Sequence, residues 1–447
     1  MPVNIHIIVV TKRRIMEKVY LVIFMVTCTV FGGIVNGCPS SCWCWHTIVS
    51  CEERSLTTVP SNIPNSTTNL YLWSNNITRI DASSFQGLSA LTHLSLWRNN
   101  ISRIDANSFQ GLSGLKSLNL SGNNITRIET NLFEELSALT ELDLKNNIIT
   151  KIDANTFEGL SALTVLDLSE NEITMIDANL FEGLSAQTEL DLSYNKITRI
   201  DANLFEGLSA LTKLSLFTNQ ITTLDVNLFN GLTALKELTL RDNQISTLDG
   251  NTFRGLTALK TLDLSMNQIS TLAVNIFQGL TALKKLNLYD IQIVTLDVNL
   301  FNGLTALTEL DLKQNKIGTL DVNLFKSLTA LEKLYLNGNQ IVTLDVNLFK
   351  DLTALTELKL ESNPLNCSMC MMKEFKDFLQ RNNDFGNSGA RCKGANLLID
   401  QNFIYCSLLG KINTVVIFLD LHGFNIVLLI AFCIIVLGHK WNHRQMG

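Results

Sequence analysis

A repeat of 24 residues runs through most of this 447-residue chain and restricts what the chain can fold into. Every unit carries leucines and isoleucines at fixed offsets, together with one phenylalanine, from Phe85 to Phe349. An asparagine recurs in register at positions 75, 99, 123, 147, 171, 195, 219, 243, 267, 315, 339 and 363. A unit of this length cannot bury its own apolar side chains, so the units must stack on one another. The repeat therefore predicts a solenoid.

The residues of one unit divide between a short strand and a turn region. Leu94 and Leu96 alternate with polar residues, as in a strand with one buried face. Asn99 can bond backbone groups where the chain leaves the strand, and Phe109 would pack beneath the convex side. Stacked units would place their strands side by side. We predict an α/β solenoid over residues 67–363, with a parallel sheet on its concave face.

Two units depart from the pattern. Ile291 stands where the recurring asparagine is expected, so one turn must satisfy its backbone in another way. Gln187 replaces the leucine that is found at positions 163 and 211. We interpret both as local defects that the array tolerates, and a functional kink is the alternative.

Eight of the ten cysteines flank the array in two groups: Cys38, Cys42, Cys44 and Cys51 before it, and Cys367, Cys370, Cys392 and Cys406 after it. Even numbers of cysteines in an exported chain indicate disulfides, and zinc is the other interpretation of each group. Disulfide-bonded caps at residues 38–66 and 364–406 would cover the apolar faces that the end units of a solenoid expose.

The spacing in "CPSSCWCWHTIVSC" resembles the N-terminal cap of extracellular leucine-rich-repeat receptors, and "NPLNCSMC" resembles the start of their C-terminal cap. The chain is similar to variable lymphocyte receptors and to Toll-like receptor ectodomains, without a Toll-type cytoplasmic domain. This resemblance implies a horseshoe with four disulfides: Cys38–Cys44, Cys42–Cys51, Cys367–Cys392 and Cys370–Cys406. The chain departs from the family where two residues, rather than one, separate Cys367 from Cys370.

The N-terminal segment indicates export. Basic residues precede an apolar run from Val19 to Val35, which is typical of a signal peptide; we assign it to residues 1–37. Translation from Met16 and an uncleaved anchor are the alternatives. Six Asn-x-Ser/Thr sequences agree with export and are candidate glycosylation sites: Asn65, Asn76, Asn100, Asn119, Asn124 and Asn366.

The C-terminal segment indicates membrane attachment. Residues 418–437 are long enough to span a bilayer, and Lys440 and Arg444 follow as a cytoplasmic positive flank. We predict one transmembrane helix after a short stalk at residues 407–417, and a glycolipid anchor is the alternative. The tail at residues 438–447 is too short for a signalling domain, so any signal would need a transmembrane signalling partner.

Strand positions that should face solvent carry candidate contact residues. In "LSLFTNQI", residues 214–221, Leu214 and Leu216 would point inward, while Ser215 and Phe217 would point toward water. Exposed aromatic residues near arginine are typical of binding hot spots, and a single exposed aromatic residue without a role is the alternative. The candidate ligand-binding residues of the concave face are Asp143, Lys145, Asp167, Asp191, Tyr194, Phe217, Arg241 and Tyr289.

Three of these candidates, Asp143, Asp167 and Asp191, would stack on adjacent strands. Like charges at that spacing are unfavourable unless water, a cation or a basic ligand relieves the repulsion. We expect an acidic patch here. A solvated face with flanking lysines is one interpretation, and a basic protein ligand or a bound cation is the other. Glycans on the first units would shield the concave face before Asp143.

The composition and the open face favour binding over catalysis. A net charge of −6 argues against nucleic acid as a partner. An open strip offers no water-excluding pocket, and no nucleophile motif or paired metal ligands accompany it, so we expect neither enzymatic activity nor a cofactor. The expected function is that of a single-pass plasma-membrane receptor for a protein or glycan ligand, of the innate-immune kind that the resemblance implies. An adhesion protein or co-receptor that binds a host cell-surface or matrix protein, and a secreted decoy, are the alternatives.

Overall fold

The computed structural model describes residues 37–366, 371–382 and 388–392 of the chain. The described residues form two compact units, one up to Ile291 and one from Gln292 onward. The boundary follows Ile291, where the recurring asparagine is missing. The predicted signal peptide up to residue 36, the stalk, the membrane span and the tail lie outside the described residues. Within the described residues, no helix has the length and the apolar character that a membrane crossing requires.

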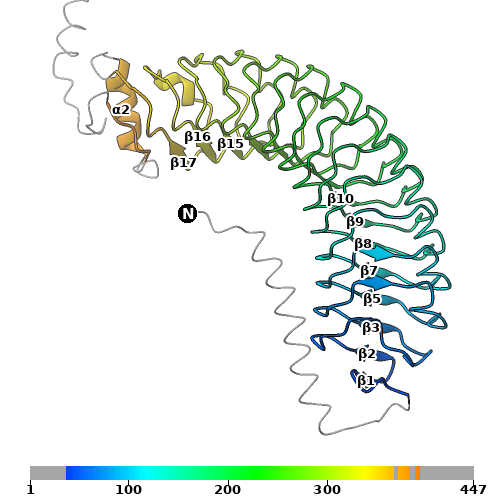
Figure 1. The fold of residues 1–447 in the computed structure, drawn as a ribbon. Helices are drawn as coiled ribbons and strands as arrows, with labels where there is room; N and C mark the ends of the chain where they lie inside the picture. Colours follow the sequence, from blue (N-terminus) through cyan, green and yellow to red (C-terminus); the bar gives the residue numbers. More distant parts are fainter. Residues whose placement is uncertain (1–36, 367–370, 383–387, 393–447) are drawn as a thin grey trace, which may run out of the picture. The chain divides into compact units, whose positions relative to one another are not determined.

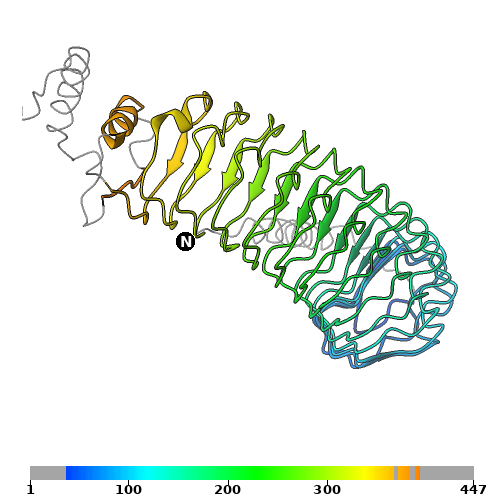
Figure 2. The ribbon, with the colours of Figure 1, turned by 90° about the horizontal axis from the view of Figure 1, so that it is seen from above.

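The first unit is a stack of short strands joined by long turns. The strands lie side by side along the inner side of its curve (Figure 1), and its green strands point the same way (Figure 2). Neighbouring strands are parallel, apart from the antiparallel pair β1 and β2. The bounds are β1 (Trp43–Trp45), β2 (Ile48–Ser50), β3 (Asn69–Tyr71), β4 (Arg79–Ile80), β5 (His93–Ser95), β6 (Arg103–Ile104), β7 (Ser117–Asn119), β8 (Glu141–Asp143), β9 (Val165–Asp167), β10 (Glu189–Asp191), β11 (Lys213–Ser215), β12 (Glu237–Thr239), β13 (Thr261–Asp263) and β14 (Lys285–Asn287). Strands β4 and β6 form a separate two-stranded sheet.

The repeat length fixes the register of the main sheet, because equivalent residues of neighbouring units pair. Leu214 on β11, for example, pairs with Leu190 on β10 and Leu238 on β12, and all three side chains are buried. This confirms the predicted parallel sheet and its inward face. Phe217 is half-buried, but Ser215 is buried and not exposed as predicted. A short serine side chain lies below the longer side chains of the flanking strands, so water does not reach it.

The convex side differs from the α/β prediction. Residues 85–91 form consecutive turns, in which the N–H of Leu88 donates to the carbonyl of Phe85 and that of Leu91 donates to the carbonyl of Leu88. Glycines with positive φ, such as Gly207 at +85°, stop these turns from continuing as helices. The solenoid is confirmed, but the described repeats of the first unit pair each strand with turns and not with an α-helix.

The recurring asparagines tie neighbouring repeats together. The buried Asn195 amide donates to the carbonyls of Leu168 at 3.0 Å and Leu192 at 3.1 Å. Its side-chain oxygen accepts the N–H of Ile173 at 3.0 Å. Ile291 has no such oxygen, so the N–H of Ile269 lacks the side-chain acceptor that its counterparts have.

The phenylalanines of the first unit form a buried stack beneath the turns. The rings of Phe157, Phe181 and Phe205 follow one another with centroids 6.4 Å apart and nearly parallel planes. All three side chains are almost fully buried. Each ring contacts its neighbours in both directions, so the burial that stabilises one repeat depends on the next.

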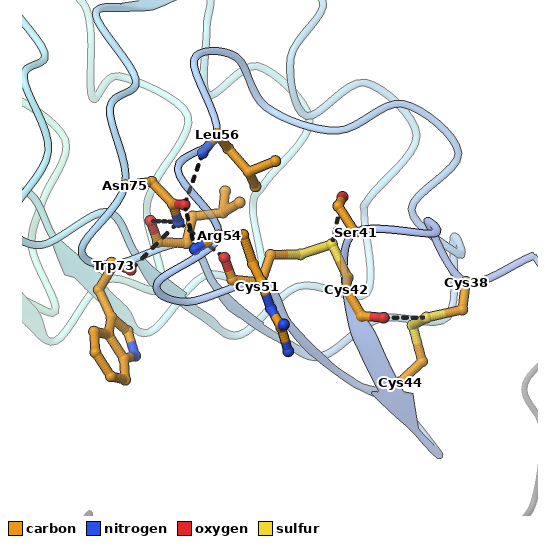
Figure 3. Close-up of a disulfide and its surroundings, with 10 residues drawn as sticks. Cys38, Ser41, Cys42, Cys44, Cys51, Arg54, Leu56, Trp73 and Asn75 are labelled. Atoms are coloured by element: carbon orange, nitrogen blue, oxygen red, sulfur yellow. Dashed lines mark hydrogen bonds between the residues drawn. A yellow bond between two sulfur atoms is a disulfide. The ribbon is translucent and has the colours of Figure 1, made fainter.

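The disulfide-bonded cap extends the sheet at its N-terminal end. The structure joins Cys38 to Cys44 and Cys42 to Cys51, the pairing that the resemblance implies (Figure 3). Strand β2 then pairs in parallel with β3 of the first repeat. The cap therefore covers the first repeat by continuing its hydrogen-bonding pattern.

Asn75, the first of the recurring asparagines, bonds the cap to the array. Its side-chain oxygen accepts the N–H groups of Arg54 and Leu56, at 2.9 and 3.0 Å (Figure 3). Its amide donates to the carbonyl of Cys51 at 2.8 Å. One asparagine thus holds three backbone groups of the cap.

The described residues of the second unit form three parallel strands, a 3₁₀ turn and a helix. Their bounds are β15 (Glu309–Asp311), β16 (Lys333–Tyr335), η1 (Val346–Phe349), β17 (Glu357–Lys359) and α2 (Met371–Arg381). The buried ring of Phe375 on α2 stacks on Phe349 with centroids 5.4 Å apart. Cys392 forms a disulfide. Cys367, Cys370 and Cys406 lie outside the described residues, so the C-terminal pairings stay predictions.

Gln187 is buried at the position where the neighbouring repeats carry Leu163 and Leu211. Its N–H donates to the carbonyl of Leu184 at 3.0 Å, as the N–H of Leu211 does to Leu208, so the backbone is not kinked. The side-chain amide donates to the carbonyl of Glu189 at 2.6 Å. The side-chain oxygen is buried without a hydrogen-bond partner among the described residues. Gln187 is therefore a local defect, as one of the two interpretations holds.

We expect Gln187→Leu to raise the free energy of unfolding by about 1–3 kcal/mol, because it removes an unpaired buried acceptor and restores apolar packing. Urea denaturation followed by circular dichroism measures this. The reverse change one repeat later, Leu211→Gln, is the matched control and should lower stability by a similar amount or more. A loss of stability in Gln187→Leu would contradict this explanation.

Candidate ligand-binding face

The strands of the first unit present two columns of side chains to one surface, which we call the strand face. The first column is the third residue of each strand, and the second column is the residue two positions further on, because alternate residues share a face. From β7 to β14 the first column reads Asn119, Asp143, Asp167, Asp191, Ser215, Thr239, Asp263 and Asn287. The second reads Ser121, Lys145, Ser169, Ser193, Phe217, Arg241, Ser265 and Tyr289.

The predicted acidic residues do lie on adjacent strands. Asp143 pairs with Asp167, and Asp167 pairs with Asp191. Each carboxylate accepts the N–H two residues further on; the acceptor distance to the N–H of Lys145 is 3.0 Å and to that of Ser169 is 2.9 Å. These bonds fix the carboxylates in a row along the strand face.

Burial and mutual repulsion raise the pKa of two of these carboxyls. Burial raises the pKa of Asp143 to about 7, and the charge of Asp167 adds to the effect. Burial also raises the pKa of Asp167, together with the charge of Asp191. A cationic ligand that approaches a carboxyl with a raised pKa stabilises its ionised form. The carboxyl and the ligand therefore attract each other.

The lysines next to the acidic row are held by glutamates. Lys145 forms an ion pair with Glu170 at 3.0 Å, and Lys196 forms one with Glu172 at 3.3 Å. Burial acts against the charge of Lys145, but the bond to Glu170 and the neighbouring aspartates raise its pKa overall. Both lysines thus form their ion pairs with glutamates, while the charge of Lys145 also acts on Asp143 and Asp167 without an ion pair to them.

The aromatic candidates form a compact cluster beside this row. Tyr194 lies edge-on to Phe217 with ring centroids 4.8 Å apart, and the Tyr194 side chain is 48% exposed. The guanidinium carbon of Arg241 lies 5.8 Å from the Phe217 ring centroid, and an Arg241 nitrogen donates to the hydroxyl of Ser265 at 3.3 Å. Phe217 is therefore flanked on the strand face by an exposed tyrosine and an arginine.

The remaining candidate, Tyr289, is not part of this cluster. It lies three strands beyond Phe217, near the end of the first unit, and is half-buried. Sequence reasoning missed two residues next to the cluster, Thr218 and Asp242. The hydroxyl of Thr218 donates to the carboxylate of Asp242 at 2.9 Å. Both occupy the position after the second column, which has positive φ in each of these repeats. Their 24-residue spacing could have revealed them.

Sequence patterns of known families cover the regions described above. The pattern described as "Leucine rich repeat" matches residues 65–125, 113–173, 161–221, 211–269, 257–317 and 305–365. The chain belongs to the leucine-rich repeat family. The pattern described as "Leucine rich repeat N-terminal domain" matches residues 37–64, which hold both disulfides of the N-terminal cap. Together with the structures below, this leucine-rich-repeat array and its cap confirm the resemblance to extracellular receptors of this family.

Individual relatives match parts of this leucine-rich-repeat chain. Human vasorin is 41% identical over 76 residues, which is 17% of this chain and 11% of vasorin. The solved TLR13–ssRNA13 complex has a TM-score of 0.68 and 28% identity, and covers 78% of this chain and 55% of the TLR13 chain. A leucine-rich-repeat protein of Leptospira interrogans has a TM-score of 0.62 and 28% identity, over 70% of this chain and 78% of its own. The chain thus spans a small part of vasorin and about half of TLR13.

Proposed function

We propose that this chain is a non-catalytic cell-surface receptor that binds a protein ligand on the strand face between Asp143 and Arg241. The observation that carries the proposal is the row of three adjacent aspartates beside the cluster of Tyr194, Phe217 and Arg241. An exposed aromatic anchor beside charged groups is the usual composition of a protein-binding hot spot.

The charge of this face selects the ligand. Lys145 and Lys196 are paired with glutamates, so the aspartate row keeps an excess of negative charge. A basic protein surface would be attracted to the row, and its charge would offset the burial and the repulsion from Asp167 that together raise the pKa of Asp143. Nucleic acid would bring phosphates against the same carboxylates, and we do not propose it as a partner.

The cellular setting is part of the proposal. The N-terminal cap with its disulfides supports an extracellular location. We keep residues 418–437 as a single membrane span and the six acceptor asparagines as glycosylation sites. Among these, Asn76, Asn100 and Asn124 are exposed, whereas the Asn119 amide donates to Asp143 at 3.1 Å. We propose innate-immune recognition as the role, on the basis of the resemblance to Toll-like receptor ectodomains.

A binding screen with the full-length chain tests the proposal. We would probe microbial surface components and host cell-surface ectodomains, and then compare Phe217→Ala, Asp167→Asn and Glu158→Gln for the ligand found. Glu158 is exposed on the turn side, so Glu158→Gln makes the same charge change away from the strand face.

We expect Phe217→Ala to weaken binding about 10- to 100-fold, as for a hot-spot aromatic residue. Asp167→Asn should weaken binding several-fold and reduce its dependence on salt, because a charge that attracts the ligand is lost. Glu158→Gln should have no effect. Equal affinity of all three variants would place the ligand elsewhere, and a host-ectodomain ligand would indicate adhesion instead of immunity.

A further inference from the structure

A second surface lies at the N-terminal end of the strand face, away from the proposed protein-binding site. We call it the tryptophan patch, and it consists of Trp43, Ser50, Glu52, Tyr71, Trp73 and Trp97. The first unit brings these residues together from the cap and the first two repeats, and three of the chain's five tryptophans are among them. The proposed protein-binding site uses none of them.

The register of the strands places the patch residues on one face. Ser50 on β2 pairs with Trp43 on one side and with Tyr71 on the other. Beyond these strands the N–H of Glu53 donates to the carbonyl of Trp73 at 3.2 Å, so Glu52 runs beside Trp73 in the same register. Alternate residues share a face, so Glu52 and Trp73 lie on the same surface as Ser50 and Tyr71.

The aromatic part of the patch is an angled platform. The rings of Trp73 and Trp97 have centroids 5.9 Å apart and planes inclined at 45°, and both side chains are half-buried. Trp73 points away from the Cys42–Cys51 disulfide and from Asn75 (Figure 3). On the far side of Trp97 the next repeat carries Gly122, where a Cβ atom would lie 3.4 Å from the indole nitrogen. The platform is therefore bordered by a residue that leaves room for the indole.

The polar part of the patch has unmet hydrogen-bonding capacity. The hydroxyl of Ser50, which is 6% exposed, has no hydrogen-bond partner among the described residues, and neither does one carboxyl oxygen of Glu52. Burial raises the pKa of Glu52, although a backbone hydrogen bond and Arg54 act in the opposite direction. Each unpaired buried group destabilises the folded state, because it has lost its hydrogen bonds to water without gaining a protein partner. Groups that disfavour folding in this way are often retained for function.

We propose that the tryptophan patch binds a neutral saccharide carried by a partner molecule. A pyranose ring has an apolar C–H face and hydroxyls at its rim. The C–H face would pack on the indoles of Trp73 and Trp97, which removes apolar area from water. The rim hydroxyls would bond to the hydroxyl of Ser50 and the carboxyl of Glu52, so that both unmet groups gain partners.

A cationic ligand fits this patch less well than a neutral one. Aromatic rings beside a carboxylate can hold an ammonium group by cation–π attraction. Here Arg54 already acts on the Glu52 carboxylate, and its positive charge would repel a second cation. The Ser50 hydroxyl also offers nothing specific to a quaternary ammonium group, whereas it complements a sugar hydroxyl.

The chain's own glycans are the competing source of a sugar. Asn76 and Asn100 are exposed and follow Trp73 and Trp97 by three residues. The chain turns between them through residues with positive φ, Ser74 and Arg98. A glycan on either asparagine therefore starts on the flank of the array and would have to fold back over this turn. We assign the patch to a partner's saccharide for this reason.

The test uses the full-length chain with Asn76→Gln and Asn100→Gln, so that no glycan is attached beside the patch. Saturation-transfer NMR and calorimetry would probe neutral trisaccharides of glucose, mannose, galactose and N-acetylglucosamine, together with tetramethylammonium. At least one trisaccharide should bind saturably, with a Kd on the order of 1 mM, typical of a few contacts on an open surface. Trp73→Ala should weaken that binding at least 10-fold.

Ser50→Ala distinguishes a loss of saccharide binding from a loss of folded protein. It removes an unpaired buried hydroxyl, so the melting temperature should stay the same or rise, while the saccharide affinity falls several-fold. Phe217→Ala, in the other site, should leave the saccharide affinity unchanged.

Three results would overturn the proposal. One is the absence of saturable binding by every trisaccharide, and another is binding of tetramethylammonium alone. The third is a glycosylated chain whose own glycan resonances shift on Trp73→Ala while the glycan-free chain binds no sugar.

Discussion

Replacing Asn195 by alanine should lower the free energy of local unfolding around Ile173 by about 2–4 kcal/mol. The Asn195 side-chain oxygen is the acceptor of the Ile173 N–H, and Ile173 is buried. Alanine leaves that N–H without a partner and away from water. The carbonyl of Leu168 loses one of two donors but keeps its bond from Asn171 at 3.1 Å. The predicted loss of free energy therefore comes mainly from the Ile173 N–H, which is left buried without an acceptor.

Hydrogen exchange at Ile173 is the suitable measurement, because a repeat array can open locally without unfolding as a whole. Asn203→Ala is the matched control, since Asn203 is exposed on the turn side of the following repeat. Exchange rates at Ile173 that are equal in the two variants would show that the asparagines do not tie the repeats together. The chain contains one natural comparison, because position 291 holds an isoleucine and the N–H of Ile269 therefore lacks the side-chain acceptor. We expect the amide of Ile269 to exchange faster than that of Ile245, which Asn267 bonds at 3.0 Å.

The features of the fold that repeat every 24 residues could be predicted from the sequence, because stacking converts sequence spacing into spatial neighbourhood. The sheet register, the buried leucines and the row of Asp143, Asp167 and Asp191 all follow from that rule. The same rule placed Phe217 beside Arg241 on adjacent strands. Where the chain breaks its own pattern, at Gln187, the sequence located the defect but not its unpaired oxygen.

The features that depend on side-chain direction could not be predicted in this way. The pairing of Lys145 with Glu170, and not with an aspartate of the row, is set by how two long side chains lean across neighbouring strands. The α/β fold class did not specify how the convex side is built, and the described repeats of the first unit form it from successive turns. The polar part of the tryptophan patch could not be predicted either, since the unpaired hydroxyl of Ser50 depends on the antiparallel register of β1 and β2.

The stability of the protein should fall as the pH rises from about 4 to about 7, and Asp143 should account for much of this change. Its pKa is raised to about 7 from an ordinary value of 3.8, chiefly by burial. Between these two values the folded state holds a proton that the unfolded state releases, so raising the pH favours unfolding. The stabilising contribution is complete below about pH 4 and is lost as the pH passes about 7. The expected change is about 2–4 kcal/mol.

Urea denaturation between pH 4 and pH 8 measures this effect. Asp143→Asn should flatten the profile over that range and raise the free energy of unfolding at pH 8, because no buried charge forms. Asp167→Asn should move the change at Asp143 to lower pH, since the charge of Asp167 contributes to the raised pKa. Glu158→Gln removes the same charge at an exposed site and should keep the profile of the unaltered protein. Identical profiles for Asp143→Asn and Glu158→Gln would refute the assignment.

The same proton links stability to the proposed ligand. A basic ligand stabilises the ionised carboxylate and must displace the proton from Asp143 when it binds below about pH 7. Because the bound ligand lowers this pKa, its affinity should rise by up to about tenfold between pH 6 and pH 8. Asp143→Asn should remove this pH dependence and also weaken binding, because the charge is gone. A ligand with the opposite pH dependence would have to be acidic, and it would contradict the proposed use of the aspartate row.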